Sequence, residues 1–204
     1  MKNNEETKQA TPSKREAFGE RIKKRFAAKR IALMAIFVAL AFVISIWDFP
    51  LFPASPVAFL KFDFGNVFIL LSSFILGPVE GVIICVIKEV LRIIIGSTGG
   101  VGEIANMITT CAFILLPSIL YQYRKGIVTV IISLLCACVL GTIAALFTNR
   151  FITFPLYLKG AAVDVFNDCF WLIAAFNIVK TLIISAVTML LYKRLSNFLK
   201  SIKF

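Results

Sequence analysis

Histidine is missing from this 204-residue chain, and acidic residues are few, with 11 Asp and Glu together. Histidine is the commonest metal ligand, so its absence removes the usual partner of cysteine in a zinc site. The five cysteines fall inside or beside apolar runs, and the spacing of Cys136 and Cys138 is not that of a CxxC motif. We therefore expect no metal site and no cofactor, and interpret the cysteines as small buried hydrophobic residues.

Catalytic signatures are equally scarce. A membrane enzyme acting on a lipid or prenyl substrate would usually carry an acidic metal-binding cluster or a histidine, and Asp164 with Asp168 is the only acidic i, i+4 pair near the membrane. The chain has no Walker A motif, and the glycine-rich segment 96–102 follows an apolar run rather than a strand. An inverted repeat with paired broken helices, typical of secondary transporters, is not evident either. The enzyme stays open as an alternative with little support, and any dependence on ATP must come from partner proteins.

Apolar side chains are abundant instead. They make up 59% of the chain, which includes 20 Phe and has a mean hydropathy of +0.91. The runs are about 17 to 25 residues long, the length that crosses a bilayer core as a helix. We predict an all-α integral membrane protein, a bundle of six transmembrane helices over 28–47, 65–76, 79–95, 101–120, 126–147 and 166–192. The first run is too long for a signal peptide, and no small-residue cleavage site follows it.

The net charge of +11 is concentrated at the edges of these runs. Basic residues crowd positions 14–30, recur in the short loop at Arg124 and Lys125, and return in the tail after Lys193. By the positive-inside rule both termini are cytoplasmic, in a multi-pass protein of the cell membrane in contact with its lipids. Nucleic acid is not an expected partner. We predict a basic cytoplasmic segment, partly disordered, at 1–27, a transmembrane domain at 28–195 and a cytoplasmic tail at 196–204.

Long connections are predicted on the outer face only. Residues 48–64 contain three prolines, 96–100 are rich in glycine, and 149–165 read as a long aromatic loop. A membrane anchor does not need elaborate loops on one face, whereas a receptor must cover and uncover a ligand there. The asymmetry favours a substrate-binding protein.

Two polar residues stand out in the last helix. Asn177 and Lys180 are three positions apart and share a face, so that an amide and an ammonium project together into the bundle. The alternative is a helix–helix hydrogen bond with a lysine that reaches the membrane surface, but Lys180 lies about a dozen residues from the cytoplasmic end, too deep for easy snorkelling. Polar groups at such depth are functional candidates.

The connections supply further candidates. Lys61 and Asp63 alternate along an extended piece, although simple exposure at the membrane surface explains them equally well. Asn149, Thr153 and Tyr157 place an amide and two hydroxyls on the outer loop, where Asn149 could instead cap a helix end.

Charges within the third and fourth helices have a structural explanation as well. Lys88 and Arg92 share one face, so that carboxylates from Glu89 or Glu103 could neutralise them and fix helix packing. Asn106 lies close to these charges in sequence and is counted among the candidate ligand contacts. On the first helix Ala28, Ala32, Ala35 and Ala39 form a smooth stripe, suited to internal packing or to docking on another membrane protein.

Four segments in this order resemble the riboflavin-binding S component of energy-coupling-factor (ECF) vitamin transporters: Phe59–Gly65, Phe74–Gly81, Gly96–Asn106 and Asn177-x-x-Lys180. The resemblance covers residues 28–195. It implies that the chain captures riboflavin, or another flavin such as flavin mononucleotide (FMN), from outside the cell, and that Asn149, Asn177 and Lys180 contact the flavin. It also implies docking through Ala32, Ala35 and Ala39 on a transmembrane coupling protein that is bound to two cytoplasmic ATPases. One departure is Lys88-Glu-Val-Leu-Arg92, where the family often has Lys-Asn-Leu-Leu-His.

Overall fold

The computed structural model describes residues 28–52, 57, 60–95, 99–124, 126–158 and 162–201, with side chains up to residue 192. The predicted N-terminal segment 1–27 and most of the tail 196–204 therefore lie outside the described residues or side chains. The chain divides into two compact units, residues 1–33 and 34–204. The second unit contains every helix and strand described below, apart from residues 28–33 of the first helix.

Six helices correspond to the six predicted transmembrane helices, and the all-α fold is confirmed. Their bounds are α2 Ala28–Ser45, α3 Gly65–Ile75, α4 Pro78–Ile95, α5 Val101–Tyr123, α6 Ile127–Thr148 and α8 Ala162–Ser201. By length and composition α2, α5, α8 and the helix that begins with α6 are each able to cross a membrane. Helix α4 is as long as α2 but carries four charged residues, Glu80, Lys88, Glu89 and Arg92, and all four are buried.

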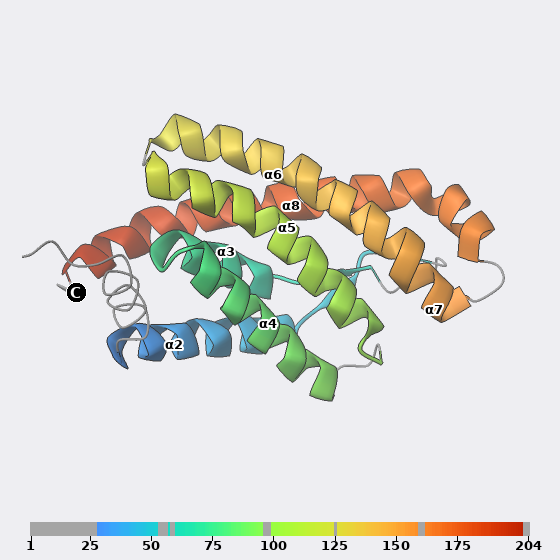
Figure 1. Cartoon of the computed structure of the whole chain (residues 1–204), viewed down its shortest axis with the longest axis horizontal. Coiled ribbons are helices and arrows are strands. Elements are labelled where there is room, and N and C mark those ends of the chain that lie inside the picture. Colours follow the sequence, from blue (N-terminus) through green and yellow to red (C-terminus); the bar gives the residue numbers. More distant parts are fainter. Residues whose placement is uncertain are drawn as a thin grey trace, which may run out of the picture. The chain divides into compact units, whose positions relative to one another are not determined.

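Helix α3 lies among three other helices of residues 34–204. Helices α5, α6 and α8 lie side by side, and α3 contacts α4, α5 and α8 (Figure 1). Nine of the 11 residues of α3 are buried, which explains its apolar and small composition. At 1.5 Å rise per residue α3 is only about 17 Å long. The polar segment before α3 is consequently brought into the bundle rather than left at its surface.

That segment contains a short antiparallel pairing. Strand β1 (Phe49–Pro50) pairs with β2 (Lys61–Phe62), with Phe49 opposite Phe62. The two rings stack with centroids 6.0 Å apart, as cross-strand aromatic pairs often do. The extended conformation predicted for the chain at Lys61 is confirmed.

The start of α3 approaches α2 closely. A Cβ atom at Gly65 would overlap the Ser45 hydroxyl and the Ala41 carbonyl oxygen, so that only glycine fits. Asp63 Oδ1 accepts hydrogen bonds from the Gly65 N–H (2.7 Å) and from Ser45 Oγ (2.6 Å). One carboxylate thereby satisfies an otherwise unpaired N–H at the helix start and joins it to α2.

The prediction of a long loop over 149–165 is wrong. Helix α6 continues through a π-helical turn, η1 (Asn149–Thr153), into α7 (Phe154–Leu158), and α8 begins at Ala162. The Phe154 N–H donates to the Asn149 carbonyl, the wide i to i−5 bond of a π turn. Pro155, which lacks an N–H and suggested a loop, follows directly after this wide turn and is accommodated within the helix.

Candidate ligand-binding site

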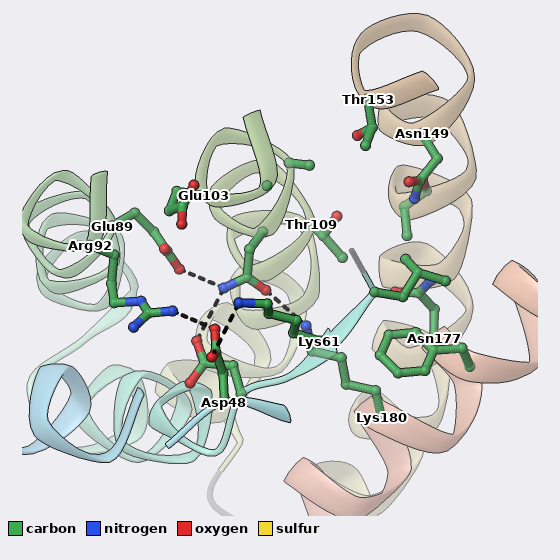
Figure 2. A pocket seen from close by; sticks show the side chains of 17 residues that line it. Asp48, Lys61, Glu89, Arg92, Glu103, Thr109, Asn149, Thr153, Asn177 and Lys180 are labelled. Carbon is green, nitrogen blue, oxygen red and sulfur yellow. Dashed lines mark hydrogen bonds and ion pairs between the residues drawn. The ribbon is translucent and has the colours of Figure 1, made fainter. Parts of the chain in front are cut away.

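A polar pocket lies where β2, α4, α5, η1 and α8 meet (Figure 2). It has two chemically different sides. Asn149, Thr153, Asn177 and Lys180 line one side, from the continuous helix α6–η1 and from α8. We call this side the amide wall. On the other side, which we call the ionic wall, are the following residues: Asp48, Lys61, Asp63, Glu89, Arg92 and Glu103.

The amide wall is held by bonds within its own helices. Asn149 Nδ2 donates to the Ala145 carbonyl (2.7 Å) and Asn177 Nδ2 to the Ile173 carbonyl (2.9 Å), each one turn back along the helix. Thr153 Oγ1 lies 3.5 Å from the Thr148 carbonyl. Within the described residues no side chain donates to the amide oxygen of either asparagine. Both oxygens can therefore accept hydrogen bonds from a ligand.

Lys180 places a cation at the edge of the amide wall. Its Nζ donates to Asn106 Oδ1 (2.8 Å) and lies 6.0 Å from the centroid of the Phe176 ring. Lys180 is 8% exposed, so the interpretation of Lys180 as a surface-reaching lysine does not hold. An ammonium has three N–H groups, which leaves donors for a ligand in the pocket.

A buried charge cluster underlies the ionic wall. Lys88, which has no exposed surface, pairs with Asp63 and with Glu89 Oε1, the latter at 2.7 Å. Asn106 Nδ2 donates to Glu89 Oε1 (2.5 Å) and to Asp63 Oδ2 (3.3 Å). The predicted pairing of Lys88 with Glu89 is confirmed. Asp63 is a second partner that the sequence did not indicate, since it lies 25 residues earlier.

Asp63 belongs to the connection between β2 and α3, outside the membrane-spanning helices. Burial raises the pKa of its carboxyl. The nearby Lys88 ammonium and hydrogen bonds from Lys88 and Ser45 lower the pKa by more, so that it lies below the ordinary value for aspartate. Asp63 is therefore a carboxylate, and its charge compensates that of Lys88.

A second set of ion pairs lies nearer the open side of the pocket. Asp48, which follows α2, accepts from Arg92 at the end of α4 and lies 3.4 Å from Lys61 Nζ on β2. Two cations therefore share one carboxylate. Arg92 had been expected to pair with Glu89 or Glu103, and the partner that the structure shows is Asp48. In the sequence Asp48 is marked only by its position, directly after an apolar helix and before three prolines.

Most of the residues singled out from the sequence are brought together. Lys61, Asp63, Asn106, Asn149, Thr153, Asn177 and Lys180 all line the pocket, whereas Tyr157 on α7 is 37% exposed and is not among its lining residues. Tyr157 is one turn beyond Thr153, on the far side of the wide π turn. The lining also includes residues that the sequence did not single out as ligand contacts, among them Asp48, Thr109 and Phe176.

The architecture and the sequence both match a known family. Residues 29–192 match the family described as ECF transporter, substrate-specific component. This chain belongs to that family. It is a non-catalytic substrate-binding subunit of a membrane transporter, and its apolar helices place it in the membrane as a multi-pass protein. A solved S component of a bacterial ECF transporter has the same fold, with a TM-score of 0.72, 34% identity and coverage of 85% of this chain and 98% of that one.

Several proteins of similar sequence carry a substrate in their names. The riboflavin transporter RibU of Staphylococcus aureus (strain TCH60) is 34% identical over 179 residues, which cover 85% of this chain and 94% of the relative. The riboflavin transporter FmnP of Bacillus subtilis (strain 168) is 30% identical over 176 residues, covering 82% and 92%. The riboflavin transporter RibU of Streptococcus thermophilus (strain ATCC BAA-250 / LMG 18311) is 24% identical, with 84% of each chain covered.

Proposed function

We propose that this S component captures riboflavin outside the cell and releases it inward together with an ECF module. The observation that carries the proposal is the donor and acceptor set of the amide wall. Asn149 and Asn177 offer amide oxygens, and Lys180 offers N–H groups beside them. The pyrimidine edge of a flavin alternates carbonyl acceptors with one ring N–H donor, which this set complements. The names of the relatives support the same substrate.

The apolar parts of the pocket suit the rest of the flavin. Leu60, Ala105, Ala145 and Phe176 line the pocket among its polar groups. An isoalloxazine ring needs a flat apolar slot, and its ribityl hydroxyl groups need polar partners of the kind found on the ionic wall. We propose that the ring lies against the amide wall and that the ribityl chain points toward Asp48, Lys61 and Arg92.

Capture requires the pocket to widen. The open volume between the lining residues is about 80 Å³, whereas sites for ligands of this size commonly enclose about 300–1,000 Å³. Helix packing fixes the amide wall. The stacked rings of Phe49 and Phe62 join β1 to β2, whereas the ion pair of Asp48 with Arg92 and the burial of Phe62 in one apolar cluster with residues of α7 and α8 hold this segment to the helices. We propose that the β1–β2 segment moves away to admit the ligand and returns over it.

Transport further requires partners, because the chain has no ATP-binding motif. We propose a transmembrane coupling protein bound to two cytoplasmic ATPases, with both termini of this chain on the cytoplasmic side. Ala32, Ala35 and Ala39 are exposed along α2. A stripe of small residues lets a helix of another membrane protein approach closely, and we propose it as the docking surface.

The decisive experiment is a flavin titration of the detergent-purified protein. We expect the protein to purify with bound flavin or to quench riboflavin fluorescence at a 1:1 ratio, and Lys180→Ala to weaken binding at least about tenfold by removal of a charged hydrogen bond. Thiamine, biotin and folate serve as negative controls, and FMN tests the alternative flavin. A colourless protein that never quenches riboflavin would refute the proposal.

A further inference from the structure

Asn106 lines the pocket, yet all of its hydrogen-bonding capacity is used within the protein. Its Nδ2 donates to Glu89 Oε1 and Asp63 Oδ2, and its Oδ1 accepts from Lys180 Nζ (2.8 Å) and from Asn66 Nδ2 (3.2 Å). A primary amide has two N–H groups and two lone pairs on its oxygen. Four partners therefore saturate Asn106, and nothing remains for a ligand.

The orientation of this amide is determined by its neighbours. The Glu89 and Asp63 carboxylates, both paired with Lys88, act as acceptors and must face the NH₂ group. The amide oxygen then faces Lys180. Asn66 on α3 donates the second hydrogen bond to the Asn106 oxygen. Its own buried Oδ1 has no hydrogen-bond partner in the described part of the chain.

The charges around Asn106 balance. Asp63 and Glu89 contribute two negative charges, and Lys88 with Lys180 two positive charges. Among the described residues, however, Lys180 forms no direct ion pair with a carboxylate, because Asn106 stands between. A direct pair would draw the ammonium of Lys180 toward the Asp63 and Glu89 carboxylates, whereas the neutral amide accepts one hydrogen bond and leaves the other N–H groups toward the pocket.

We propose that Asn106 is a positioning residue, which holds the Lys180 ammonium in its ligand-binding orientation and separates it from the Asp63–Lys88–Glu89 cluster without touching the ligand. The inference rests on the proposed riboflavin site, since it assigns the orientation of one of its contacts. The hydrogen bonds of this amide to Glu89 and to Lys180 are among the dashed lines of Figure 2, which labels both of these partners.

A double-mutant cycle distinguishes positioning from direct contact. We expect Asn106→Ser to weaken riboflavin binding about tenfold and Lys180→Met by at least as much, because each removes the same oriented ammonium. The double variant should then bind like Lys180→Met, within about twofold, since sites that act through one another are not additive. A double variant in which the two losses multiply would show that Asn106 acts on the ligand directly and would overturn the inference.

The second arm needs no ligand. Reductive methylation of Lys180, followed by mass spectrometry of the ligand-free protein, should proceed several-fold faster in Asn106→Ser because the amide no longer restrains the ammonium. Thr109→Val, a pocket-lining change three residues along α5, is the matched control and should leave the rate unchanged. An unchanged rate in Asn106→Ser overturns the inference even if riboflavin binding fails for the wild type, which would count against the proposed function alone. Thermal unfolding verifies folding, and Asn106→Thr replaces Asn106→Ser if the latter does not fold.

Discussion

The two walls of the pocket are built by different means. On the amide wall Asn149 and Asn177 are oriented by carbonyls of their own helices, four residues back. On the ionic wall and in the charge cluster beneath it, ion pairs join different elements: Asp48 pairs with Arg92, 44 residues later, and Asp63 pairs with Lys88, 25 residues later. The two asparagines of the amide wall are consequently preorganised wherever their helices form, whereas Lys180, held by Asn106, and the ionic wall take their positions only when the bundle is assembled.

This difference assigns the two walls different tasks. Preorganised groups lose little freedom when they bind, so they are suited to ligand recognition. A buried ion pair across elements contributes less net stability than its geometry suggests, but removal of one partner leaves an uncompensated charge and is severe. We therefore expect changes in the ionic cluster to act on folding and changes in the amide wall to act on affinity.

The largest effect is expected for Lys88→Met. It leaves the Asp63 and Glu89 carboxylates buried without their cation, at a cost of about 3–5 kcal/mol of stability. Yield and thermal unfolding in detergent measure the loss. Lys61→Met, on the ionic wall itself and partly exposed, is the control and should cost no more than about 1 kcal/mol. Equal stability of Lys88→Met and Lys61→Met would remove the distinction between the two walls.

Asn177→Leu tests the amide wall. The change removes an acceptor that no described side chain uses, so stability should be nearly retained while riboflavin affinity falls about tenfold or more. Thr181→Val on the same helix is a suitable control, because Thr181 is buried, bonds only carbonyls of its own helix among the described residues and does not line the pocket. Fluorescence titration measures the riboflavin affinity of both variants, and thermal unfolding in detergent measures their stability. A loss of stability without a loss of affinity would contradict the assignment.

Asp48→Asn probes the open end of the ionic wall with a smaller effect. Asp48 neutralises Lys61 and Arg92 together, and its loss leaves two cations where we place the ribityl chain. The affinity for FMN relative to riboflavin should rise several-fold, and the gain should shrink as salt is added because these groups are partly exposed. Competition titrations at two salt concentrations measure the ratio. An unchanged ratio would place the end of the ligand elsewhere.

The same contrast explains what the sequence could predict. Apolar periodicity and run length predicted all six helices, and α3, α4 and α5 begin within one residue of the predicted positions. Asn177 and Lys180 were identifiable because polar groups in a membrane helix are costly. Local signals therefore sufficed for the helices and for much of the amide wall.

Features that depend on tertiary contacts were not predictable. Pro155 signals a loop in water, but in a membrane bundle the chain keeps its helix through a π turn. The partners of Lys88 and Arg92 are set by how the segment before α3 returns into the bundle, which no pattern within α4 encodes. Nor did the sequence distinguish Asn106 as a saturated amide, because that depends on four neighbours from three other helices and the segment before α3.

The smallest effect on the purified protein is expected for Ala35→Leu, which lies on neither wall. Ala35 is exposed on α2, so a larger side chain meets no neighbour among the described residues and riboflavin affinity should stay within about twofold. Uptake in vesicles that contain the coupling protein and ATPases should nevertheless fall, because a branched side chain prevents close helix approach. Ile36→Leu, an exposed change off the alanine stripe, should leave uptake intact. Normal uptake by Ala35→Leu would place the docking surface elsewhere than on α2. A loss of riboflavin affinity would instead mean that α2 is coupled to the pocket, so that docking and ligand capture depend on one structural element.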